Sequence, residues 1–537
     1  MIVRNRIQKD ESNVIIWKEL LTPGDMRKTE QKAFEAGMPS ILLMEHAAMK
    51  VVDALEKELG GCDGKRVVFL CGTGNNGGDG LAAARLFQAR GGWPEIWLSG
   101  DPKTPDAKIN LGLAQACRID ILNLSKLPRE EWPFSEGFSP HRHHDGYVDA
   151  LLGIGMKGEP DFITSAMILA PYHDFQDHTV IAVDVPSGMD ALTGDCPGVY
   201  VHADVTVTFH KAKPGLYLSQ DREAVGRIIP ADIGLEALDC CCLDEKELDL
   251  EITTPAYMKY LQDRPLDAHK GDCGRILIYA GSMGMAGAAA MCAKAAVCAG
   301  AGLVTVACPR EIIPILQCLV PNAMCMDIEV AIKNPPAYDV LAVGCGLTQS
   351  EEIWENIQKL FNPAKPSVWD ADALNMLARH PMKLGSQAVI TPHPGEAARL
   401  LGITPDQVLQ DPIRAARTLQ GKYSCCALLK GDVSIACAIS LVSGAPKYVF
   451  NALGTPALAK GGSGDALTGI LAALLHTEGA SASTAAMASA WHGMAGMIGE
   501  KRHGQRELTT LQLIECLHEA EQWGKGKIAP PAGWEGC

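Results

Sequence analysis

Apolar, strand-like runs alternate with helical segments through most of the 537-residue chain. KRVVFLCG at 65–72 leads into the helical LAAARLFQARG at 81–91, and GRILIYAG at 274–281 leads into a small-residue helix over 286–302. Parallel strands need a crossover, usually a helix, whereas antiparallel strands can be joined by a short hairpin. The alternation therefore predicts an α/β protein whose largely parallel sheets are covered by helices on both faces.

A change in composition divides the chain. Residues 235–251 combine clustered cysteines with the charged DEKELDLE. At roughly 150 residues a domain, we predict a Rossmann-like three-layer domain over 1–235, a connector over 236–250, a second α/β domain over 251–524 and a tail over 525–537. Further strands of the second domain are expected at LVTVAC 303–308, DVLAVG 339–344, PSVWDAD 366–372, QAVITPH 387–393, CCALLKG 425–431 and ISLVSG 439–444, before a long helical tail over 464–501.

The charge balance excludes two classes of partner. The 48 basic and 63 acidic residues give a net charge of −15, and the sequence contains no long Lys/Arg block. Nucleic acid and anionic membrane surfaces attract such basic blocks, so we expect neither partner. The 19 cysteines are odd in number and lack zinc spacing, which indicates reduced thiols, the consecutive Cys240–Cys242 among them. Since no run of 18 apolar residues occurs either, we expect a cytoplasmic protein.

A glycine-rich stretch, GTGNNGGDG at 72–80, follows a predicted strand and precedes a predicted helix. Glycine lets the backbone turn tightly and approach a phosphate at a helix N-terminus. A dinucleotide site also needs an acid about 20 residues on for the ribose, but Glu95 precedes the next predicted strand. A dinucleotide-binding turn needs only the glycines of this stretch, so the polar residues Asn75, Asn76 and Asp79 are additional to that motif. The alternative is a simple turn, in which Asn and Asp tolerate left-handed backbone.

Polar residues also follow two other predicted strands. Asp149 opens DALLGIGMKGE, while Asp184 and Ser187 follow the apolar run TVIAV. Ligands of open α/β sheets collect at the carboxyl ends of the strands. Asn76, Asp149 and Ser187 are therefore predicted to converge and offer three oxygen ligands to a cation. Asp184 would lie beside them as an acid/base group, although each residue taken singly fits an N-cap or turn role better.

A second glycine-rich stretch, GGSGDALTG at 461–469, passes from a loop into an apolar helix. The amides of Gly462 to Gly464 are predicted to face an oxyanion, which the helix dipole favours. Asp465, in the first turn, is placed to take a proton from a substrate hydroxyl as phosphoryl transfer begins. The alternative role for Asp465 is an N-cap after a flexible loop. The sequence lacks a Walker motif, which excludes a P-loop NTPase.

Further polar residues and glycines accompany this stretch at other predicted strand ends. They are Gly344, Gly346, Asp370, Asp372, Asn375, His393, Glu396 and Lys430. Lys430 precedes a glycine and is suited to contact phosphate, whereas a lone histidine such as His393 is more often structural. Together these residues favour the interpretation that Asp465 belongs to an active site over the interpretation that it is only an N-cap.

The three segments GTGNNGGDG, DALLGIGMKGE and DVPSGMDALTG, in this order, resemble the NAD(P)HX epimerase family over residues 20–235. The resemblance implies a potassium ion at Asn76, Asp149 and Ser187. In the reaction that we predict for this domain, Asp184 is the proton-handling group, and Lys157 is a weaker candidate to assist it. The implied substrate contacts are Asn75, Asn76, Gly77, Gly78, Asp79, Gly153, Ile154, Gly155, Met156, Lys157, Gly158, Glu159 and Asp184. The family commonly has Asn where this chain has His46, which bears on rate and pH dependence if the position touches the substrate.

The second half resembles the ribokinase-like fold, in particular the ADP/ATP-dependent NAD(P)H-hydrate dehydratase family, over residues 250–520. The segments that carry the resemblance are HKGDCGRILIYAGSMGMAGAA, TPHPGEAARLL, LLKGDVSI and GGSGDALTG. The implied contacts to the hydrated nucleotide are Ala286, Gly346, His393 and Asp465. The implied contacts to ADP or ATP are Lys430, Gly431, Asp432, Val433, Ser434 and Gly464. Small residues are usual in the family after Lys-Gly, so Asp432 is a departure that adds charge near a phosphate.

Both resemblances belong to one repair pathway, and their fusion in one chain strengthens each of them. We predict a bifunctional enzyme that interconverts the R and S epimers of NADHX and NADPHX and dehydrates the S epimer with ADP, or with ATP, as phosphoryl donor. Mg²⁺ is expected to accompany the nucleotide, and we expect a homo-oligomer. One alternative is a ribokinase-like kinase for a vitamin or sugar. Another is a first domain that only binds nucleotides or a protein partner and regulates the second.

Overall fold

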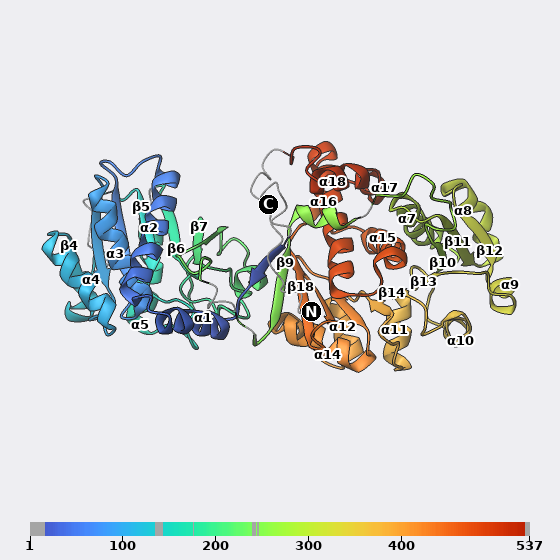
Figure 1. The fold of residues 1–537 in the computed structure, drawn as a ribbon, viewed down its shortest axis with the longest axis horizontal. Helices are drawn as coiled ribbons and strands as arrows, with labels where there is room; N and C mark the ends of the chain where they lie inside the picture. Colours follow the sequence, from blue (N-terminus) through green and yellow to red (C-terminus); the bar gives the residue numbers. More distant parts are fainter. Residues whose placement is uncertain are drawn as a thin grey trace. The chain divides into compact units, whose positions relative to one another are not determined.

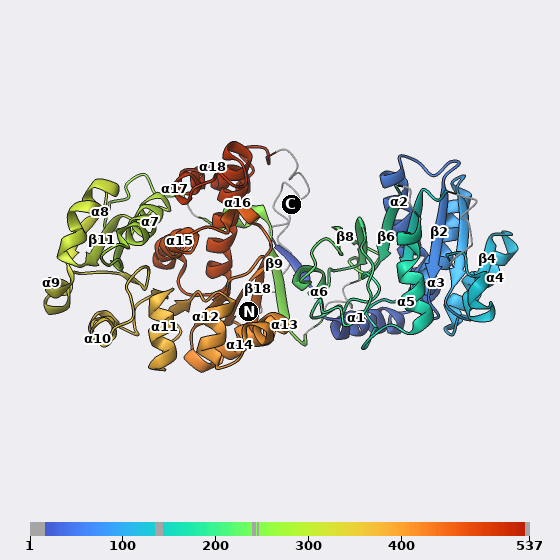
Figure 2. The same ribbon diagram turned by 180° about the vertical axis from the view of Figure 1, so that it is seen from behind.

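The computed structural model describes residues 17–134, 143–174, 177–238, 243, 246–261 and 263–531. It divides into two compact units (Figures 1 and 2). One unit comprises Glu19–Glu247, and the other runs from Leu248 and also includes the start of strand β1 (Trp17–Leu20). The division falls within the predicted connector 236–250. Cys240–Cys242 lie outside the described residues.

The Glu19–Glu247 unit is built on a parallel sheet in the strand order β4-β3-β2-β5-β6-β7-β8. These strands are β2 (Arg66–Cys71), β3 (Trp93–Leu98), β4 (Asp120–Asn123), β5 (Gly146–Ala150), β6 (Thr179–Val183), β7 (Val205–Phe209) and β8 (Arg227–Ala231). Its α-helices are α1 (Pro23–Glu35), α2 (Ser40–Leu59), α3 (Asn75–Ala89), α4 (Pro105–Ala116), α5 (Phe162–Leu169) and α6 (Gly215–Leu218). The predicted Rossmann-like architecture is confirmed.

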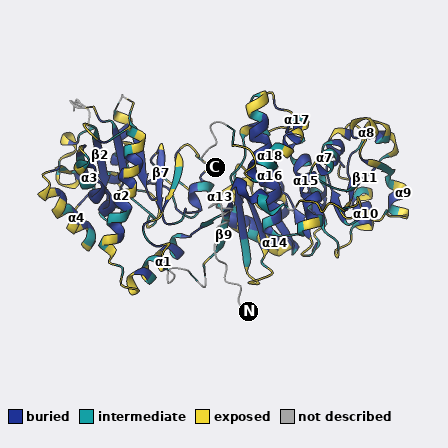
Figure 3. Cartoon of the chain, turned by 45° about the horizontal axis from the view of Figure 1, so that its top comes forward, coloured by how far each residue is buried: buried dark blue, intermediate teal, exposed yellow. Residues whose placement is uncertain are grey.

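Both faces of this sheet are buried. Val67, Phe69 and Cys71 of β2 join a core that includes residues of α2 and α3, while Val68 and Leu70 join a second core that includes residues of α5. Successive strand residues face opposite sides of a sheet, so a strand without polar residues needs a covering layer on each side. Figure 3 shows these strands as buried elements flanked by helices with exposed outer surfaces. Each such buried side chain stabilises the unit by about 1.5–3 kcal/mol.

The second unit has the sheet order β1-β9-β18-β17-β16-β15-β14-β13-β10-β11-β12. Its remaining strands are β9 (Asp249–Thr253), β10 (Arg275–Tyr279), β11 (Leu303–Cys308), β12 (Met324–Asp327), β13 (Val340–Val343), β14 (Ser367–Trp369), β15 (Ala388–Ile390), β16 (Cys426–Leu429), β17 (Ser434–Ile439) and β18 (Pro446–Asn451). Strands β10 to β16 are parallel, whereas β17 is antiparallel to β16 and β18. The predicted α/β class and the helical cover hold for this unit too.

The helices of the second unit follow its strands. They are α7 (Ala286–Cys298), α8 (Ile313–Leu319), α9 (Ile328–Lys333), α10 (Glu351–Leu360), α11 (Asp372–Arg379), α12 (Pro394–Leu401), α13 (Pro405–Gln410), α14 (Pro412–Tyr423), α15 (Ser463–Glu478), α16 (Ala482–His503), α17 (Thr510–Glu515) and α18 (Leu517–Gly524). Among the described residues, no helix has the length and apolar character needed to cross a bilayer.

Three expectations about single elements are wrong. The run 439–444 is not a strand, because β17 ends at Ile439 and the chain turns with Leu441 and Val442 almost fully exposed. The helical tail is two helices, since Gly479 (φ 69°) ends α15 before Ser481 caps α16. Glu95 lies inside β3 rather than before it.

Each parallel sheet has one point where the order of the strands reverses. In the first unit the chain moves outward from β2 to β4 and then returns to place β5 beside β2. In the second it moves from β10 to β12 and returns to place β13 beside β10. Because the loops part at such a point, the crevice outside the carboxyl ends of the strands is where ligands bind in open α/β sheets. The fold therefore contains two candidate sites, one in each unit.

Candidate active sites

The glycine-rich turn of the first unit packs directly against the end of β5. A Cβ atom on Gly72 would lie 1.9 Å from the carbonyl oxygen of Leu151, and one on Gly77 would lie 1.9 Å from that of Gly72. Only glycine fits at either position. The turn therefore brings the N-terminus of α3, with Asn75 and Asn76, to the crevice between β2 and β5.

Asn76, Asp149 and Ser187 meet around the carbonyl group of Leu152. Asn76 Nδ2 donates to Leu152 O over 2.9 Å, and Ser187 Oγ donates to Asp149 Oδ1 over 2.6 Å. The backbone N–H of Ser187 donates to Asp149 Oδ2 over 2.7 Å, and that of Leu151 donates to Asp149 Oδ1 over 3.2 Å. The structure thus brings together the three residues for which a cation was predicted.

The Asp149 carboxylate is fully buried and, within the described residues, forms no ion pair. Burial raises its pKa to about 6, against the effect of the hydrogen bonds from Ser187 and Leu151. A buried anion without a cationic neighbour is costly unless a counter-charge is supplied. Ser187 Oγ lies beside this carboxylate, and both Ser187 Oγ and Asn76 contact the Leu152 carbonyl oxygen, so the cluster gathers oxygen atoms that suit a bound cation.

Asp184 is held by a buried lysine that the sequence analysis did not identify. Lys213 Nζ lies 2.5 Å from Asp184 Oδ1, and the lysine side chain is fully buried. The ammonium group also donates to Thr208 Oγ1 over 3.1 Å and to Phe209 O over 3.0 Å. These four residues come from the ends of β6 and β7 and from the segment that follows. Asp184 itself has a φ of 68°, a left-handed backbone that Asp tolerates.

Two further carboxyl groups belong to this cluster. Burial, followed by the charge of Asp184, raises the pKa of Glu30 on α1 to about 7. The same two causes, in the same order, raise the pKa of Asp79 on α3 well above its usual range. Lys213 also lowers the pKa of Glu30 against these causes, but the acid with which it forms an ion pair is Asp184. Glu30, like Lys213, was missed because nothing in its local sequence distinguishes it from a surface helix residue.

The other predicted contacts lie on the loop after β5. Arg27 Nη2 donates to Ile154 O over 2.9 Å, which ties this loop to α1. Lys157 is exposed, and the structure records no contact between it and Asp184 within the described residues. His46 Nδ1 lies 2.9 Å from Ile233 O, so this residue contacts backbone. The remaining loop residues that were predicted are Gly153, Gly155, Met156, Gly158 and Glu159, of which Gly155, Gly158 and Glu159 are exposed.

In the second unit, Lys430 and Asp370 form the ion pair at the strand ends. Lys430, directly after β16, places Nζ 2.7 Å from Asp370 Oδ1, directly after β14. Thr468 of α15 donates to Asp370 Oδ2 over 2.8 Å. A Cβ atom on Gly464 would lie 3.4 Å from Lys430 Nζ. The pair therefore lies against the first turn of α15, where a phosphate was predicted.

Asp465 is the third residue of α15, which begins after Gly462 in a left-handed conformation (φ 91°). Burial raises the pKa of Asp465 to about 6, and the charge of Asp370 adds to this, while Cys345 and Lys430 oppose it. The carboxyl group is therefore close to the Asp370–Lys430 pair and titrates near neutral pH. That is the range in which a carboxylate can serve as a general base.

His393 and Glu396 begin α12 as a capping box. The N–H of Gly395 donates to His393 Nδ1, and the N–H of His393 donates to Glu396 Oε2, each over 3.0 Å. Burial lowers the pKa of His393 and raises that of Glu396. In both residues the Lys430 charge is a further cause, so the box lies beside the same lysine. His393 thus has a structural bond through Nδ1 while its ring stays half exposed.

Ala286 and Gly346 lie together across the reversal point between β10 and β13. Ala286 starts α7, and a Cβ atom on Gly346 would lie 3.0 Å from the Cβ atoms of Ala288 and Met285. Ser282 Oγ donates to Gly346 O over 2.9 Å. The other predicted nucleotide contacts form the turn between β16 and β17: Gly431 and Asp432 are exposed, Val433 is half-buried and Ser434 is buried.

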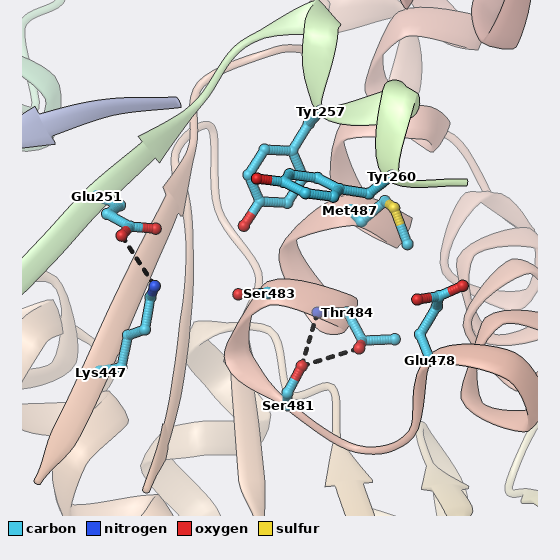
Figure 4. Close-up of a pocket in the computed structure, with 9 residues that line it drawn as sticks. All are labelled: Glu251, Tyr257, Tyr260, Lys447, Glu478, Ser481, Ser483, Thr484 and Met487. Carbon is cyan, nitrogen blue, oxygen red and sulfur yellow. Dashed lines mark hydrogen bonds and ion pairs between the residues drawn. The ribbon is translucent and has the colours of Figure 1, made fainter. Parts of the chain in front are cut away.

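A separate cavity of about 240 Å³ lies at the opposite end of α15 (Figure 4). Its lining includes Glu478, the last residue of that helix, which is about 20 Å along the helix axis from Asp465 at 1.5 Å per residue. Lys447 pairs with Glu251 over 2.8 Å in its wall. The cavity therefore does not belong to the strand-end cluster around Asp465.

Comparisons with known proteins match both units. A model of NAD(P)H-hydrate dehydratase matches residues 276–519, and one of YjeF-related protein N-terminus matches residues 40–215. The chain is 33% identical to the bifunctional NAD(P)H-hydrate repair enzyme Nnr of Moorella thermoacetica, over 93% of this chain and 96% of that protein. It is 34% identical to the protein of the same name from Escherichia coli, over 85% of each. Among solved structures, the chain is similar to the ADP/ATP-dependent NAD(P)H-hydrate dehydratase from Bacillus subtilis, co-crystallized with ATP/Mg²⁺. The two are 26% identical with a TM-score of 0.46, and the match covers 50% of this chain and 97% of the Bacillus chain.

Proposed function

The chain belongs to the family of bifunctional NAD(P)H-hydrate repair enzymes, and we propose that it performs both repair reactions, one in each unit. It interconverts the R and S epimers of NADHX and NADPHX, and it dehydrates the S epimer with ADP to give NAD(P)H, AMP and phosphate. One observation supports two separate sites. Each unit holds a carboxylate–lysine pair at the ends of its strands, Asp184–Lys213 in one and Asp370–Lys430 in the other.

Epimerisation requires the hydroxyl group to leave one carbon of the hydrated ring and to be replaced on the opposite face. The ring nitrogen expels the neighbouring hydroxyl, which leaves as water, and water adds to the opposite face of the iminium-like ring. Asp184 hands a proton to the leaving hydroxyl and recovers a proton from the adding water. Lys213 supplies the proton to the Asp184 carboxylate in the first step and takes it back in the second, which restores the ion pair. Lys157, exposed on its loop, would contact the bound substrate.

Potassium would be held by the oxygen atoms of Asn76, Asp149 and Ser187. These are hard oxygen donors, and the buried Asp149 carboxylate needs a counter-charge. When bound, the ion supplies a fixed positive charge that orients the phosphates of the substrate. The proton steps stay with Asp184 and Lys213.

Exchanging potassium for tetramethylammonium at constant ionic strength should lower the melting temperature. An ion that binds only the folded state stabilises it by about 2.7 kcal/mol at a hundredfold excess over Kd. Calorimetry in the two salts measures the difference, which Asp149→Asn should abolish. Asp101→Asn is the matched control, because Asp101 is exposed, and this variant should still show the difference in melting temperature between the two salts. Equal melting temperatures for the unsubstituted protein in both salts would contradict a cation at this cluster.

Dehydration replaces a poor leaving group by a good one. Asp465 takes the proton from the hydroxyl of S-NADHX as that oxygen attacks the β-phosphorus of ADP, and AMP leaves. The phosphate then departs with the electron pair of its C–O bond, and loss of a ring proton restores the dihydronicotinamide. Lys430 and the first amides of α15 would stabilise the charge on the transferred group. Mg²⁺ would enter with the nucleotide, because this ion is usually held by substrate phosphates and only one or two carboxylates.

The rate of dehydration should fall on the acid side of about pH 6. Asp465 acts as a base only when ionised, and its pKa is raised to about 6. Lowering the pH from 7 to 5 therefore reduces the ionised fraction from about nine-tenths to about one-tenth. The measurement is kcat/KM for S-NADHX at saturating ADP, with epimerisation followed in the same buffers. A profile that stays flat through this range would assign the base to another group.

The function is tested by adding the protein, ADP, Mg²⁺ and K⁺ to a mixture of both NADHX epimers and following NADH absorbance. Recovery of the whole pool demonstrates both reactions, because dehydration alone stops at the S fraction. A stable phosphorylated product in place of AMP and phosphate would favour a small-molecule kinase. Recovery that stops at the S fraction would favour a first unit that only binds or regulates.

A further inference from the structure

His492 of α16 contacts the first turn of α15, next to the proposed base. Its Nε2 lies 3.2 Å from Ser463 Oγ, and both residues are buried, with exposed fractions of 7% and 8%. Ser463 lies two residues before Asp465. Within the described residues, the hydrogen bonds recorded for the His492 ring go to Ser463, which links His492 to the turn that carries Asp465.

The composition of this turn makes Ser463 its single side-chain anchor. The residues from 461 to 464 are Gly, Gly, Ser and Gly, so only Ser463 carries a side chain that can be held. The first amides of a helix also lack partners within the helix. One turn later, Thr468 is fixed by its bond to Asp370. The Ser463–His492 contact therefore helps to fix the direction of the turn, together with the bond from Thr510 Oγ1 to Gly461 O over 3.1 Å.

The contact persists over the pH range of the reaction. Burial lowers the pKa of His492 to about 4, and the charge of Lys430 adds to this, so the ring is neutral near pH 7. A hydrogen bond to the backbone of Ser463 acts in the opposite direction. The contact therefore joins a neutral imidazole nitrogen to the Ser463 hydroxyl group.

We propose that His492 is a positioning residue of the dehydration site, which holds the first turn of α15 through Ser463. In this position the amides of Gly464 and Asp465 and the Asp465 carboxylate keep the direction that phosphoryl transfer requires. The inference rests on the proposed dehydration function. Misplacing a reacting group by 1 Å can cost about 10²-fold in rate, so the effect is expected in kcat.

The test compares His492→Leu, Ser463→Ala and the double variant in the full chain. Each single variant should lower kcat for dehydration by about 10–100-fold, with KM for ADP changed little. The double variant should lose no more than either single one, because all three lack the same contact. His492→Gln, which can still form a hydrogen bond with Ser463, should recover most of the rate. Losses that add in the double variant would overturn the proposal.

Ser489→Ala is the matched control. Ser489 lies on α16 one turn before His492, and it accepts from Asn451 Nδ2 over 3.0 Å, away from α15. Its loss should lower the melting temperature without lowering kcat. If His492→Leu lowers only the melting temperature, the role is structural and the proposal is wrong. If the unsubstituted protein forms no NADH from S-NADHX, the dehydration function itself is overturned, which separates the two failures.

Discussion

Asp465→Asn abolishes dehydration of S-NADHX and leaves epimerisation intact. The amide keeps the size of the side chain but cannot take the hydroxyl proton, and general base catalysis contributes about 10²–10⁴ in rate. We therefore expect kcat to fall by about three orders of magnitude. Melting temperature should change little or rise, because burial already disfavours the charged form of this carboxyl group. AMP formation, followed separately from NADH, shows whether the loss occurs at phosphoryl transfer.

Glu478→Gln is the control for Asp465→Asn, since it removes a carboxylate from the far end of the same helix. It should leave both reactions unchanged. The R/S ratio of the substrate pool, measured in the same samples, reports on the other unit. If Asp465→Asn lost epimerisation as well, two independent sites would be contradicted.

Lys213→Met abolishes epimerisation and destabilises the first unit. Methionine fills a similar volume but leaves the buried Asp184 carboxylate without its cation, and breaking one partner of a buried ion pair costs about 3–5 kcal/mol. Calorimetry should resolve a lower transition for this unit, while dehydration of pure S-NADHX continues. Lys211→Met is the matched control, because Lys211 lies two residues earlier and pairs with Glu236 over 2.6 Å at a more exposed position.

The double variant Asp184→Asn with Lys213→Met separates stability from catalysis. Asn tolerates the left-handed backbone at position 184, and the charge that Lys213→Met leaves unpaired at Asp184 is removed as well. The free energy of unfolding should return toward the original value, whereas epimerisation stays absent because the proton-handling group is gone. Recovery of epimerisation in the double variant would show that another group carries the proton.

Most of the fold could be predicted because its signals are local. The apolar strands, the helices between them and the glycines that only a tight turn accommodates all lie within short segments, as in the run from β2 through Gly72 to α3. The placement of Asn76, Asp149 and Ser187 followed from one topological rule, that polar residues at the ends of parallel strands gather at one edge. The turn after Ile439 was misread because its apolar residues face solvent.

The partners of the catalytic carboxylates could not be predicted, because their contacts join distant segments. Lys211 and Lys213 are two residues apart in HKAKPGL, yet one lies near the surface and the other is buried against Asp184. Nothing in the local sequence separates these outcomes. The bond from Thr468 to Asp370 likewise spans 98 residues. Such contacts depend on register and on helix packing, which a sequence pattern does not specify.

Strand β1 has a consequence for truncation. Its first two residues, Trp17 and Lys18, precede the first unit in sequence but belong to the second unit, and the strand lies next to β9 at the edge of the sheet of that unit. The first unit is thus an insertion near the start of the second. A fragment that starts at Leu248 would lack this edge strand and expose the unpaired backbone of β9, which invites aggregation. Joining residues 17–20 to such a fragment through a short linker should give a more soluble dehydratase than simple deletion.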